Sequence, residues 1–379
     1  MKIVHLCLSC FFIDGRGYQE NELVRQHVRE GHDVLVIAST ETHSPDGALM
    51  YVKPAEYVGE EGARVIRLAY FPGIPHGLVR KLRIHAGVYD LLAQFKPDTI
   101  LFHGACGWEL RTVARFVRDY PSVMFYVDSH EDWNNSARGA ISREFLHKLY
   151  YRAVLQSSLP SVKKILCVST ETMQFVKEIY GIPQERLEFY PLGGRPVPDD
   201  EYAERRSRTR MALGLRQLDI VFVQSGKQTR RKKLLESLRA FIAVDDRRFR
   251  FLVVGVLDEE IRGEAEKLMA GDARIRYVGW KTQEELTDIL CAADVYVQPG
   301  TQSATMQHSL CARCAVVLDD VPAHEVYHRG NGWLINNERP LEAALIEAQG
   351  ADLELLQANS YRIACEMLDY SILSRRVLS

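Results

Sequence analysis

The stretch Val295–Asp320 reads VYVQPGTQSATMQHSLCARCAVVLDD and predicts a strand, a turn, a helix and a second strand, in that order. An apolar run ends at Pro299 and Gly300, Ser303 is a residue type that starts helices well, and a second apolar run leads to Asp320. Strands joined through a helix are typical of a parallel sheet, which binds ligands beyond the carboxyl ends of its strands. The stretch therefore predicts a ligand-binding turn, and that turn contains no carboxylate.

The same alternation of strands and amphipathic helices occupies both halves of the chain. A segment rich in glycine and proline, residues 190–201, separates the halves. The predicted strands are residues 2–8, 34–39, 64–70, 99–104, 123–128 and 165–169, then 220–226, 249–255, 275–279, 295–298, 315–320 and 333–335. Apolar strands that alternate with helices predict an α/β fold of parallel sheets covered on both faces. We expect two Rossmann-like domains, residues 1–194 and 195–358, that face one cleft.

Composition limits the classes of function. The 379 residues exceed one comfortable hydrophobic core, and a formal net charge of −2 gives no overall attraction to nucleic acid. The eight cysteines predict reduced thiols and hence a cytoplasmic protein. The sequence has no Asp-x-Asp pair, no close His/Cys/Asp group and no G-x-G-x-x-G spacing, so we expect neither a bound metal nor a nicotinamide cofactor.

Two segments of the second domain are candidate anion sites. The basic segment SGKQTRRKK, residues 225–233, follows a predicted strand and is expected to open a helix. It is either the solvated start of a helix or, as its place at the carboxyl end of a strand favours, a clamp for a diphosphate. Its candidate residues are Gly226, Lys227 and Lys232. Ser303, Ala304 and Thr305 form either a phosphate cradle at a helix start or an ordinary N-cap.

The first domain places polar residues after its predicted strands. Gly17, Tyr18 and Gln19 follow the first strand, His103 ends the fourth, and His130 and Glu131 follow the fifth. A lone histidine is usually a hydrogen-bonded core residue. A crowd of polar groups at a strand end is a better catalytic candidate, so we assign His130 and Glu131 to catalysis and the other four to the acceptor side of the cleft.

Six segments in the same order resemble glycosyltransferase family 4 of the GT-B sugar transferases over nearly the whole chain. They are GYQENELVRQHVREGHDVLVI, FKPDTILFHG, ILCVSTETMQFVKEIYGIPQERLEFYPLGG, SGKQTRRKKLLESLRAF, RYVGWKTQEELTDILCAADVYVQPG and EVYHRGNGWLI. The resemblance implies a nucleotide-sugar donor held by the second domain, an acceptor held by the first, and metal-independent transfer with retention. It implies that a last helix, residues 359–379, crosses back to the first domain.

The resemblance also assigns residues. The family's basic pair on the donor diphosphate falls on Lys227 and Lys232, and a family histidine near the donor sugar falls on His130. The family's acidic pair is absent: its first member lies nearest Gln302 and its second falls on His308. We expect neutral hydrogen bonds from Gln302, and from either Gln307 or His308, to replace the two carboxylates.

The function predicted is transfer of a sugar from a UDP- or GDP-sugar to a glycan or lipid-linked acceptor, in polysaccharide or glycoconjugate biosynthesis. Two alternatives stay open: a non-catalytic GT-B subunit that binds a partner transferase or glycan, and a GT-B epimerase. Residues 78–92, LVRKLRIHAGVYDLL, are either a basic amphipathic helix that docks on the inner face of a membrane or an ordinary helix with one wet face.

Overall fold

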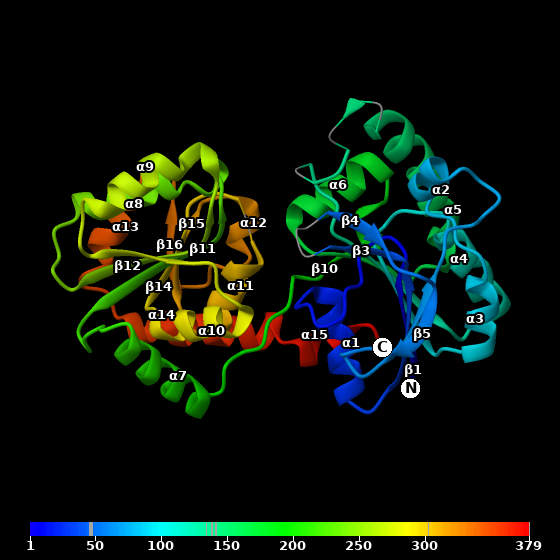
Figure 1. The fold of residues 1–379 in the computed structure, drawn as a ribbon, viewed down its shortest axis with the longest axis horizontal. Helices are drawn as coiled ribbons and strands as arrows, with labels where there is room; N and C mark the ends of the chain where they lie inside the picture. Colours follow the sequence, from blue (N-terminus) through cyan, green and yellow to red (C-terminus); the bar gives the residue numbers. More distant parts are fainter. Residues whose placement is uncertain (45–47, 134, 138, 141, 302, 379) are drawn as a thin grey trace. The chain divides into compact units, whose positions relative to one another are not determined.

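A computed structural model describes residues 1–44, 48–133, 135–137, 139–140, 142–301 and 303–378. The chain divides into two compact units (Figure 1). The first unit consists of Met1–Pro191 together with Tyr370–Ser379, and the second consists of Leu192–Asp369. Each unit is a parallel sheet with helices on both faces, which confirms the predicted α/β fold with two Rossmann-like domains.

The described residues of the first unit form an eight-stranded sheet in the order β10-β9-β8-β7-β1-β2-β6-β5. Its strands are β1 (Lys2–Cys7), β2 (Asp33–Ser39), β5 (Ala55–Val58), β6 (Arg64–Leu68), β7 (Thr99–His103), β8 (Met124–Ser129), β9 (Lys164–Cys167) and β10 (Leu187–Phe189). All neighbours pair in parallel except β5, which runs antiparallel to β6 at the edge. A separate hairpin joins β3 (Glu41–His43) to β4 (Leu49–Tyr51). Thus β7 and β8 lie side by side, and both end at the carboxyl edge.

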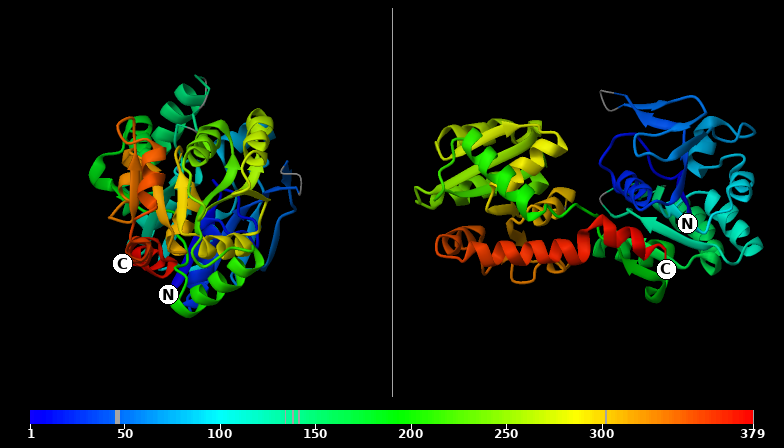
Figure 2. Two further views of the ribbon diagram at one scale, coloured as in Figure 1. Left: turned by 90° about the vertical axis from the view of Figure 1, so that its left-hand side faces the viewer. Right: turned by 90° about the horizontal axis from the view of Figure 1, so that it is seen from below.

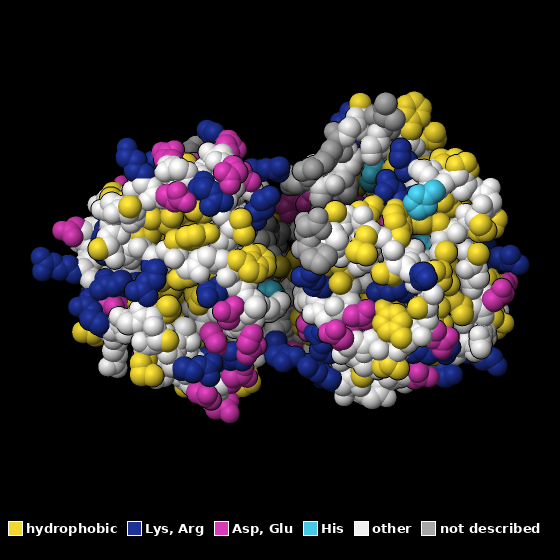
Figure 3. All heavy atoms as spheres, viewed as in Figure 1, with side chains coloured by type: hydrophobic (Ala, Val, Ile, Leu, Met, Phe, Trp, Pro, Cys, Tyr) yellow, Lys and Arg dark blue, Asp and Glu magenta, His cyan; other side chains and the backbone are white. Residues whose placement is uncertain are grey.

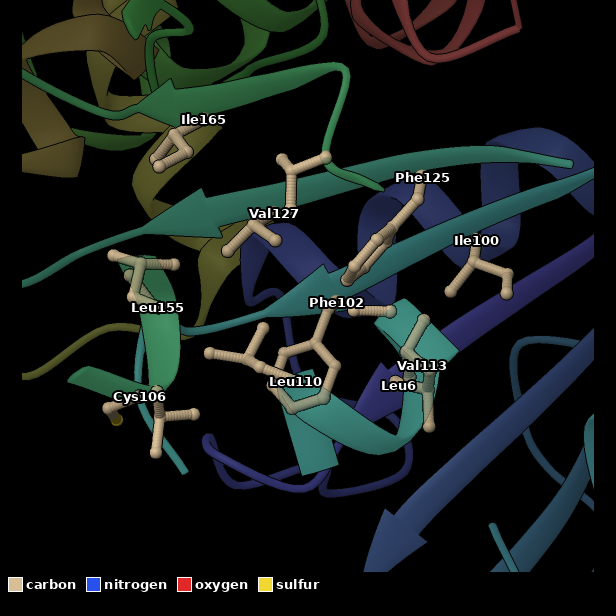
Figure 4. Close-up of a cluster of buried hydrophobic side chains, with 14 of the residues drawn as sticks. Leu6, Ile100, Phe102, Cys106, Leu110, Val113, Phe125, Val127, Leu155 and Ile165 are labelled. Atoms are coloured by element: carbon tan, nitrogen blue, oxygen red, sulfur yellow. The ribbon is translucent and has the colours of Figure 1, made fainter. Parts of the chain in front are cut away.

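Helices cover both faces of this sheet. They are α1 (Gln19–Arg29), α2 (His76–Leu82), α3 (Val88–Phe95), α4 (Glu109–Asp119), α5 (Arg152–Ser158), α6 (Thr170–Tyr180) and α15 (Tyr370–Arg376), with a π-helical segment, Ser142–Tyr151, before α5. The face under α3 to α6 holds the larger apolar cluster, in which Phe102 and Phe125 pack against Leu110 (Figure 4). Helices α1 and α15 pack side by side on the other face, where Leu23 and Leu373 are buried.

The second unit has a six-stranded parallel sheet in the order β13-β12-β11-β14-β15-β16 among its described residues. The strands are β11 (Ile220–Gln228), β12 (Phe249–Leu257), β13 (Ile275–Gly279), β14 (Val295–Gln298), β15 (Ala315–Asp319) and β16 (Gly332–Ile335). The order turns back between β11 and β14, so the segments that leave these two strands lie at a topological switch point. This is the place where an open parallel sheet binds ligands.

Two groups of helices enclose this second sheet (Figures 1 and 2). The helices are α7 (Asp199–Ala212), α8 (Leu234–Ala243), α9 (Glu259–Ala270), α10 (Gln283–Ala292), α11 (Ala304–Cys311), α12 (Pro322–Glu325), α13 (Leu341–Ala348) and α14 (Leu353–Ile363). Helices α8, α9 and α13 pack together, and α10 packs between α7 and α11 on the other side. Helix α10 begins with a capping box, in which Thr282 and Glu285 bond to each other's backbone N–H groups.

The unit boundaries differ slightly from the predicted ones. The first break falls at Pro191, within the predicted linker. Residues 359–369, predicted to return to the first domain, belong to the second unit, because α14 packs on β15 and a π-helical segment, Ala364–Leu368, follows it. Only the last segment, α15, joins the first unit, where Leu373 and Val377 are buried.

The prediction of one amphipathic helix over residues 78–92 was wrong. Helix α2 ends at Leu82 because Arg83 takes the left-handed conformation, with φ 54°. Helix α3 starts anew at Val88, and its Leu92 packs in the core. The basic and apolar residues of this stretch therefore do not share one continuous helical face.

Two surface properties bear on function. Side chains of both charge signs are spread over both units in the view of Figure 3, in keeping with the small net charge. Within the part of the chain that the structure describes, every helix is too short or too polar to cross a membrane.

Candidate active site

The basic segment of the second unit folds differently from the prediction. Strand β11 continues to Gln228, so Gly226 and Lys227 lie in the strand itself. A single 3-10 turn, Arg230–Lys232, follows, and α8 begins only at Leu234. The expected helix start at these cations was therefore wrong. The segment is a strand end followed by a tight turn, still at the carboxyl edge of the sheet.

The turn that follows β14 packs against this basic segment. Gly300 has φ 145°, and a Cβ atom there would lie 2.2 Å from the Arg231 carbonyl oxygen. Only glycine fits so close an approach. The Lys232 Nζ donates a hydrogen bond of 2.6 Å to the Thr301 carbonyl. The loops after β11 and β14 therefore form one structure, built at the switch point of the sheet.

Hydroxyl groups line the start of α11. The Thr305 hydroxyl lies 2.7 Å from the Tyr296 hydroxyl and 2.9 Å from that of Ser303, which donates to the Gln298 side-chain oxygen at 2.7 Å. Ser303 makes no side-chain capping bond, so its expected role as a side-chain N-cap was wrong. Gly226 lies beside this cluster, since a Cβ atom there would sit 3.9 Å from the Thr305 Oγ1.

The two lysines differ in their surroundings. Burial lowers the pKa of Lys232 to about 8, and its Nζ is bonded to the neighbouring loop at the Thr301 carbonyl. Lys227 is 70% exposed, with its Nζ 3.8 Å from Asp258. A phosphate near Lys232 would restore the stability of its charged form, because an anion at close range favours the ammonium. The geometry thus provides one anchored cation and one exposed cation at the same sheet edge.

The predicted replacements for the family's acidic residues have mixed outcomes. Gln302 lies outside the described residues. Ala304 begins α11, and His308 lies one turn further along that helix, where its Cδ2 is 3.6 Å from the position of a Cβ atom on Gly194. Gln307 is fully buried and donates to the Tyr327 hydroxyl at 2.9 Å. The expectation that Gln307 reaches toward a ligand was therefore wrong.

In the first unit, the ends of β7 and β8 bring together a carboxylate and two histidines. The Asp128 Oδ2 lies 2.5 Å from the His103 Nδ1 and 3.7 Å from the His130 Nε2. Asp128 Oδ1 accepts a bond of 2.8 Å from the Gly104 N–H. Asp128 and His103 are each 1% exposed in their side chains, whereas His130 is 38% exposed. Only His130 of this trio is open to a substrate; His103, expected on the acceptor side, is buried beneath it.

The charges of this trio follow from their contacts. Burial disfavours both charged histidines, but the Asp128 carboxylate outweighs burial and raises the pKa of His130, and that of His103 to about 9. Burial likewise opposes the charge on Asp128, and the two histidines overcome it and hold its pKa well below the usual range. His103 and Asp128 therefore form a buried ion pair next to the exposed His130.

Glu131 holds the loop after β8. Its Oε1 accepts from the Ala105 N–H at 3.1 Å, and its Oε2 accepts from the Ser129 hydroxyl at 2.5 Å and the His130 N–H at 3.1 Å. Three hydrogen-bond donors of the protein thus bind this carboxylate, which favours a structural role for Glu131 in holding the loop. The predicted catalytic role of Glu131 stays a prediction.

The first turn of α1 contributes a residue that was not among the predicted site residues. Gly17 and Tyr18 are exposed, and the Gln19 side chain donates to the Pro191 carbonyl at 3.2 Å. The next residue, Glu20, is buried and interacts electrostatically with His103 and His130. Burial raises its pKa above the usual range. The sequence did contain one signal for Glu20: it is an acidic residue on the first turn of a helix that follows the end of a strand.

The His103–Asp128 pair predicts how stability depends on pH. The pKa of His103 is about 9 in the folded state and 6.5 when unpaired. The stabilisation is fully present below pH 6.5 and is lost as pH rises through 9, because only the folded state keeps this proton. We expect the free energy of unfolding to fall by ~3 kcal/mol across that window. Urea titrations at several pH values measure this free energy. The His103→Asn substitution should flatten its dependence on pH, and the exposed control His76→Asn should leave that dependence unchanged. A flat wild-type profile contradicts the ion pair.

Among the described residues, no three His, Cys, Asp or Glu side chains are grouped so as to hold a metal ion. The expectation of metal-independent chemistry stays a prediction.

The chain matches known protein families in both units. Residues 17–193 match the model of a "Glycosyl transferase 4-like domain", and residues 217–349 match that of "Glycosyl transferases group 1". No curated protein sequence matches the chain.

Solved structures with the same fold cover the whole chain. A sucrose-phosphate synthase from Thermosynechococcus elongatus matches with TM-score 0.65 at 15% identity, over 99% of this chain and 96% of that one. Anabaena HepE, solved with UDP and glucose, matches with TM-score 0.61 at 14% identity, over 100% and 98%. WaaG, a glycosyltransferase involved in lipopolysaccharide biosynthesis, matches with TM-score 0.60 at 18% identity, over 99% and 98%. Likeness at such identities establishes the fold.

Proposed function

We propose, because the chain belongs to the GT-B glycosyltransferases, that it moves a sugar from a nucleotide-diphosphate sugar to a glycan or lipid-linked acceptor. The single observation that carries this proposal is the joined pair of loops at the switch point of the second sheet. There Lys232 is anchored to the Thr301 carbonyl, and the hydroxyls of Ser303 and Thr305 lie at the start of α11.

A diphosphate is the ligand that suits these groups. Lys227 and Lys232 supply two positive charges beside a helix start, where backbone N–H groups favour anions. Structural neighbours support the choice of donor, since HepE was solved with UDP-glucose and a trehalose-6-phosphate protein from E. coli with UDP-2-fluoro glucose. We therefore favour a UDP-sugar and keep a GDP-sugar as the second candidate.

The carboxylate-free turn is proposed to bind the donor through neutral groups. The linked hydroxyls of Ser303 and Thr305 can each turn their hydrogen toward a phosphate or sugar oxygen, because a hydroxyl both donates and accepts. Absence of two negative charges also removes repulsion of the diphosphate. Gln302 and His308 are proposed to contact the sugar.

His130 is proposed to act on the transferring sugar, with retention of configuration and without a metal ion. Its ring is exposed, and Asp128 favours its charged form. A protonated imidazole can stabilise negative charge that develops on the departing diphosphate, and the two lysines offset the charge already present. Because these side chains already supply the positive charge that a metal ion would provide, we expect activity in the presence of a chelator.

A non-catalytic subunit is the second candidate function. The observation that favours it is the absence of the family's acidic pair from the turn before α11 and from α11 itself. Such a subunit would keep the fold and bind a partner transferase or a glycan. The cytoplasmic location and the contact with a membrane also stay predictions.

A donor screen tests the proposed function. The melting temperature of the wild-type protein is measured with UDP-, GDP- and ADP-sugars, and the donor that stabilises it is then assayed for hydrolysis and transfer, with and without EDTA. We expect one nucleotide to raise the melting temperature and turnover to survive EDTA. If no sugar nucleotide has an effect, the non-catalytic subunit is the better conclusion. If EDTA abolishes turnover and Mg²⁺ restores it, the metal-independent mechanism is wrong.

A further inference from the structure

Three buried histidines stand in one hydrogen-bonded row behind His130. The His27 Nε2 lies 3.1 Å from the Ser374 carbonyl oxygen, and the His27 Nδ1 lies 3.0 Å from the His5 Nε2. The His5 Nδ1 lies 2.9 Å from the His103 Nε2, and the His103 Nδ1 meets Asp128 at 2.5 Å. The row joins α15, α1, β1, β7 and β8, and all its members belong to the first unit.

Counting protons fixes the charge of this row. Its two ends, the Ser374 carbonyl and the Asp128 carboxylate, can only accept hydrogen bonds. Four hydrogen bonds between these ends require four protons, whereas three neutral imidazoles carry three. The row therefore carries one proton more than its neutral form, and every ring nitrogen is satisfied only in that state.

The extra proton belongs on His103. Because the Ser374 carbonyl needs a donor, His27 and then His5 must each present Nε2–H and leave Nδ1 bare, and His103 must donate from both nitrogens. Burial lowers the pKa of His5 well below its usual range and that of His27 to about 4, so both are neutral. For His103 burial acts in the same direction, and the Asp128 carboxylate overcomes it and raises the pKa to about 9.

We propose that His5 and His27 are positioning residues for the proposed sugar transfer: they hold His103 as a buried imidazolium that offsets part of the charge of Asp128 and so sets the charge and orientation of His130. This inference rests on the proposed function for its catalytic meaning, but the state of the row can be tested without any substrate.

The row holds a charge and does not conduct it. A carbonyl oxygen cannot take up a proton, so the end at Ser374 is closed, and His5, His27 and His103 are buried. His130 at the other end is the exposed member. It alone exchanges its proton with solvent or substrate, while the proton on His103 stays in place.

Other titratable groups face the row and contribute to its charge. Glu20 interacts electrostatically with both His103 and His130. Cys7 interacts in the same way with His103, and Glu131 with His130. Glu30 and His32 act on His27 at the far end. The thiol of Cys10, which is hydrogen-bonded to that of Cys7, interacts electrostatically with Glu20 and Asp128. Asp128 is the carboxylate that bonds directly to His103, which is why the extra proton sits there.

Nitrogen NMR of histidine-labelled protein tests the state of the row directly. We expect His103 in the wild-type protein to show two protonated ring nitrogens at pH 8, and His5 and His27 to show a single Nε2–H each. A neutral His103 at pH 8 overturns the proposal. Signals are assigned by single His→Asn substitutions.

A matched pair of substitutions tests the link to His130. In His5→Leu the His103 Nε2–H loses its acceptor, so we expect His103 to become neutral and the full charge of Asp128 to raise the pKa of His130 by about one unit. In His5→Gln an amide again offers one donor and one acceptor, and we expect His103 to keep both protons. A titration of His130 that is the same in wild type and His5→Leu overturns the positioning role.

A pH profile then connects the row to the reaction. The alkaline limb of kcat/KM, which reflects loss of the His130 proton, should move upward by about one pH unit in His5→Leu and return in His5→Gln. If the alkaline limb does not shift in His5→Leu although NMR shows a neutral His103 in that variant, the row has no influence on catalysis. If the wild-type protein has no sugar-nucleotide activity, the proposed function fails, and the NMR results still decide the row.

Discussion

His130→Ala is expected to lower turnover about a hundredfold or more while donor affinity changes by no more than about twofold. The side chain is partly exposed just after β8, and although burial opposes its charge, the neighbouring Asp128 raises its pKa, so it is available in its charged form. A group that acts mainly on charge developing in the transition state affects turnover far more than binding. The measurement is steady-state kinetics beside calorimetric titration with the donor found in the screen.

Controls separate catalysis from folding in this test. His130→Gln keeps a hydrogen-bonding side chain but cannot carry a positive charge, so it should be nearly as slow as His130→Ala. His76→Ala removes an exposed histidine of the same unit and should behave as wild type. Normal turnover in His130→Ala, or a loss that follows a lowered melting temperature, contradicts the assigned role.

Lys232→Ala is expected to weaken binding of the nucleotide-diphosphate donor by tenfold or more. A hydrogen bond to a charged group contributes about 1.5–3 kcal/mol, which corresponds to roughly 10- to 150-fold in affinity. The Nζ also anchors the Thr301 loop, so part of the loss will come from disorder of that loop. Because burial lowers the pKa of Lys232 to about 8, wild-type affinity should decline as pH rises past 8.

Two substitutions bracket this result. Arg230→Ala removes a charge from the same segment, but Arg230 is 78% exposed and paired with Glu260, so its effect should be under about twofold. Lys232→Arg keeps the charge and should retain more affinity than Lys232→Ala. Equal donor affinity in Lys232→Ala and wild type, measured by calorimetry, would show that the diphosphate is held elsewhere.

Most of the strands that the sequence predicted are buried, the edge strand β13 with its two exposed residues being the main exception. All twelve predicted runs form strands of the two parallel sheets, because an uninterrupted apolar run has no other stable place in an α/β protein. The strands that escaped prediction are short or exposed. Strand β5 pairs antiparallel at an edge, all three residues of β4 are partly open to solvent, and β10 has three residues. Their pairing depends on neighbours that are distant in sequence.

The predictions for three local segments were wrong because the folded protein gives these segments a different conformation from the one that their sequence favours. The basic run after β11 has the composition of a helix start, yet it extends β11 because residues 220–228 pair along β12 over their whole length. Ser303 has the identity of an N-cap, but its hydroxyl bonds to Gln298 and Thr305 instead. Arg83 interrupts a pattern that would otherwise continue as one helix. For the first two, a partner outside the segment, β12 or Gln298, accompanies the change of conformation.

The sequence by itself determined the two-domain α/β fold and the edge of each sheet where the polar residues gather, because the alternation of strands and helices is a local pattern and the carboxyl-end rule follows from it. It also identified His130, Lys227 and Lys232 as candidates. Only the tertiary structure decided which groups share protons and charges. His5, His27, His103 and Asp128 come from four separate elements. A hydrogen bond depends on separations of a few tenths of an ångström between such elements, and no pattern along the chain specifies them.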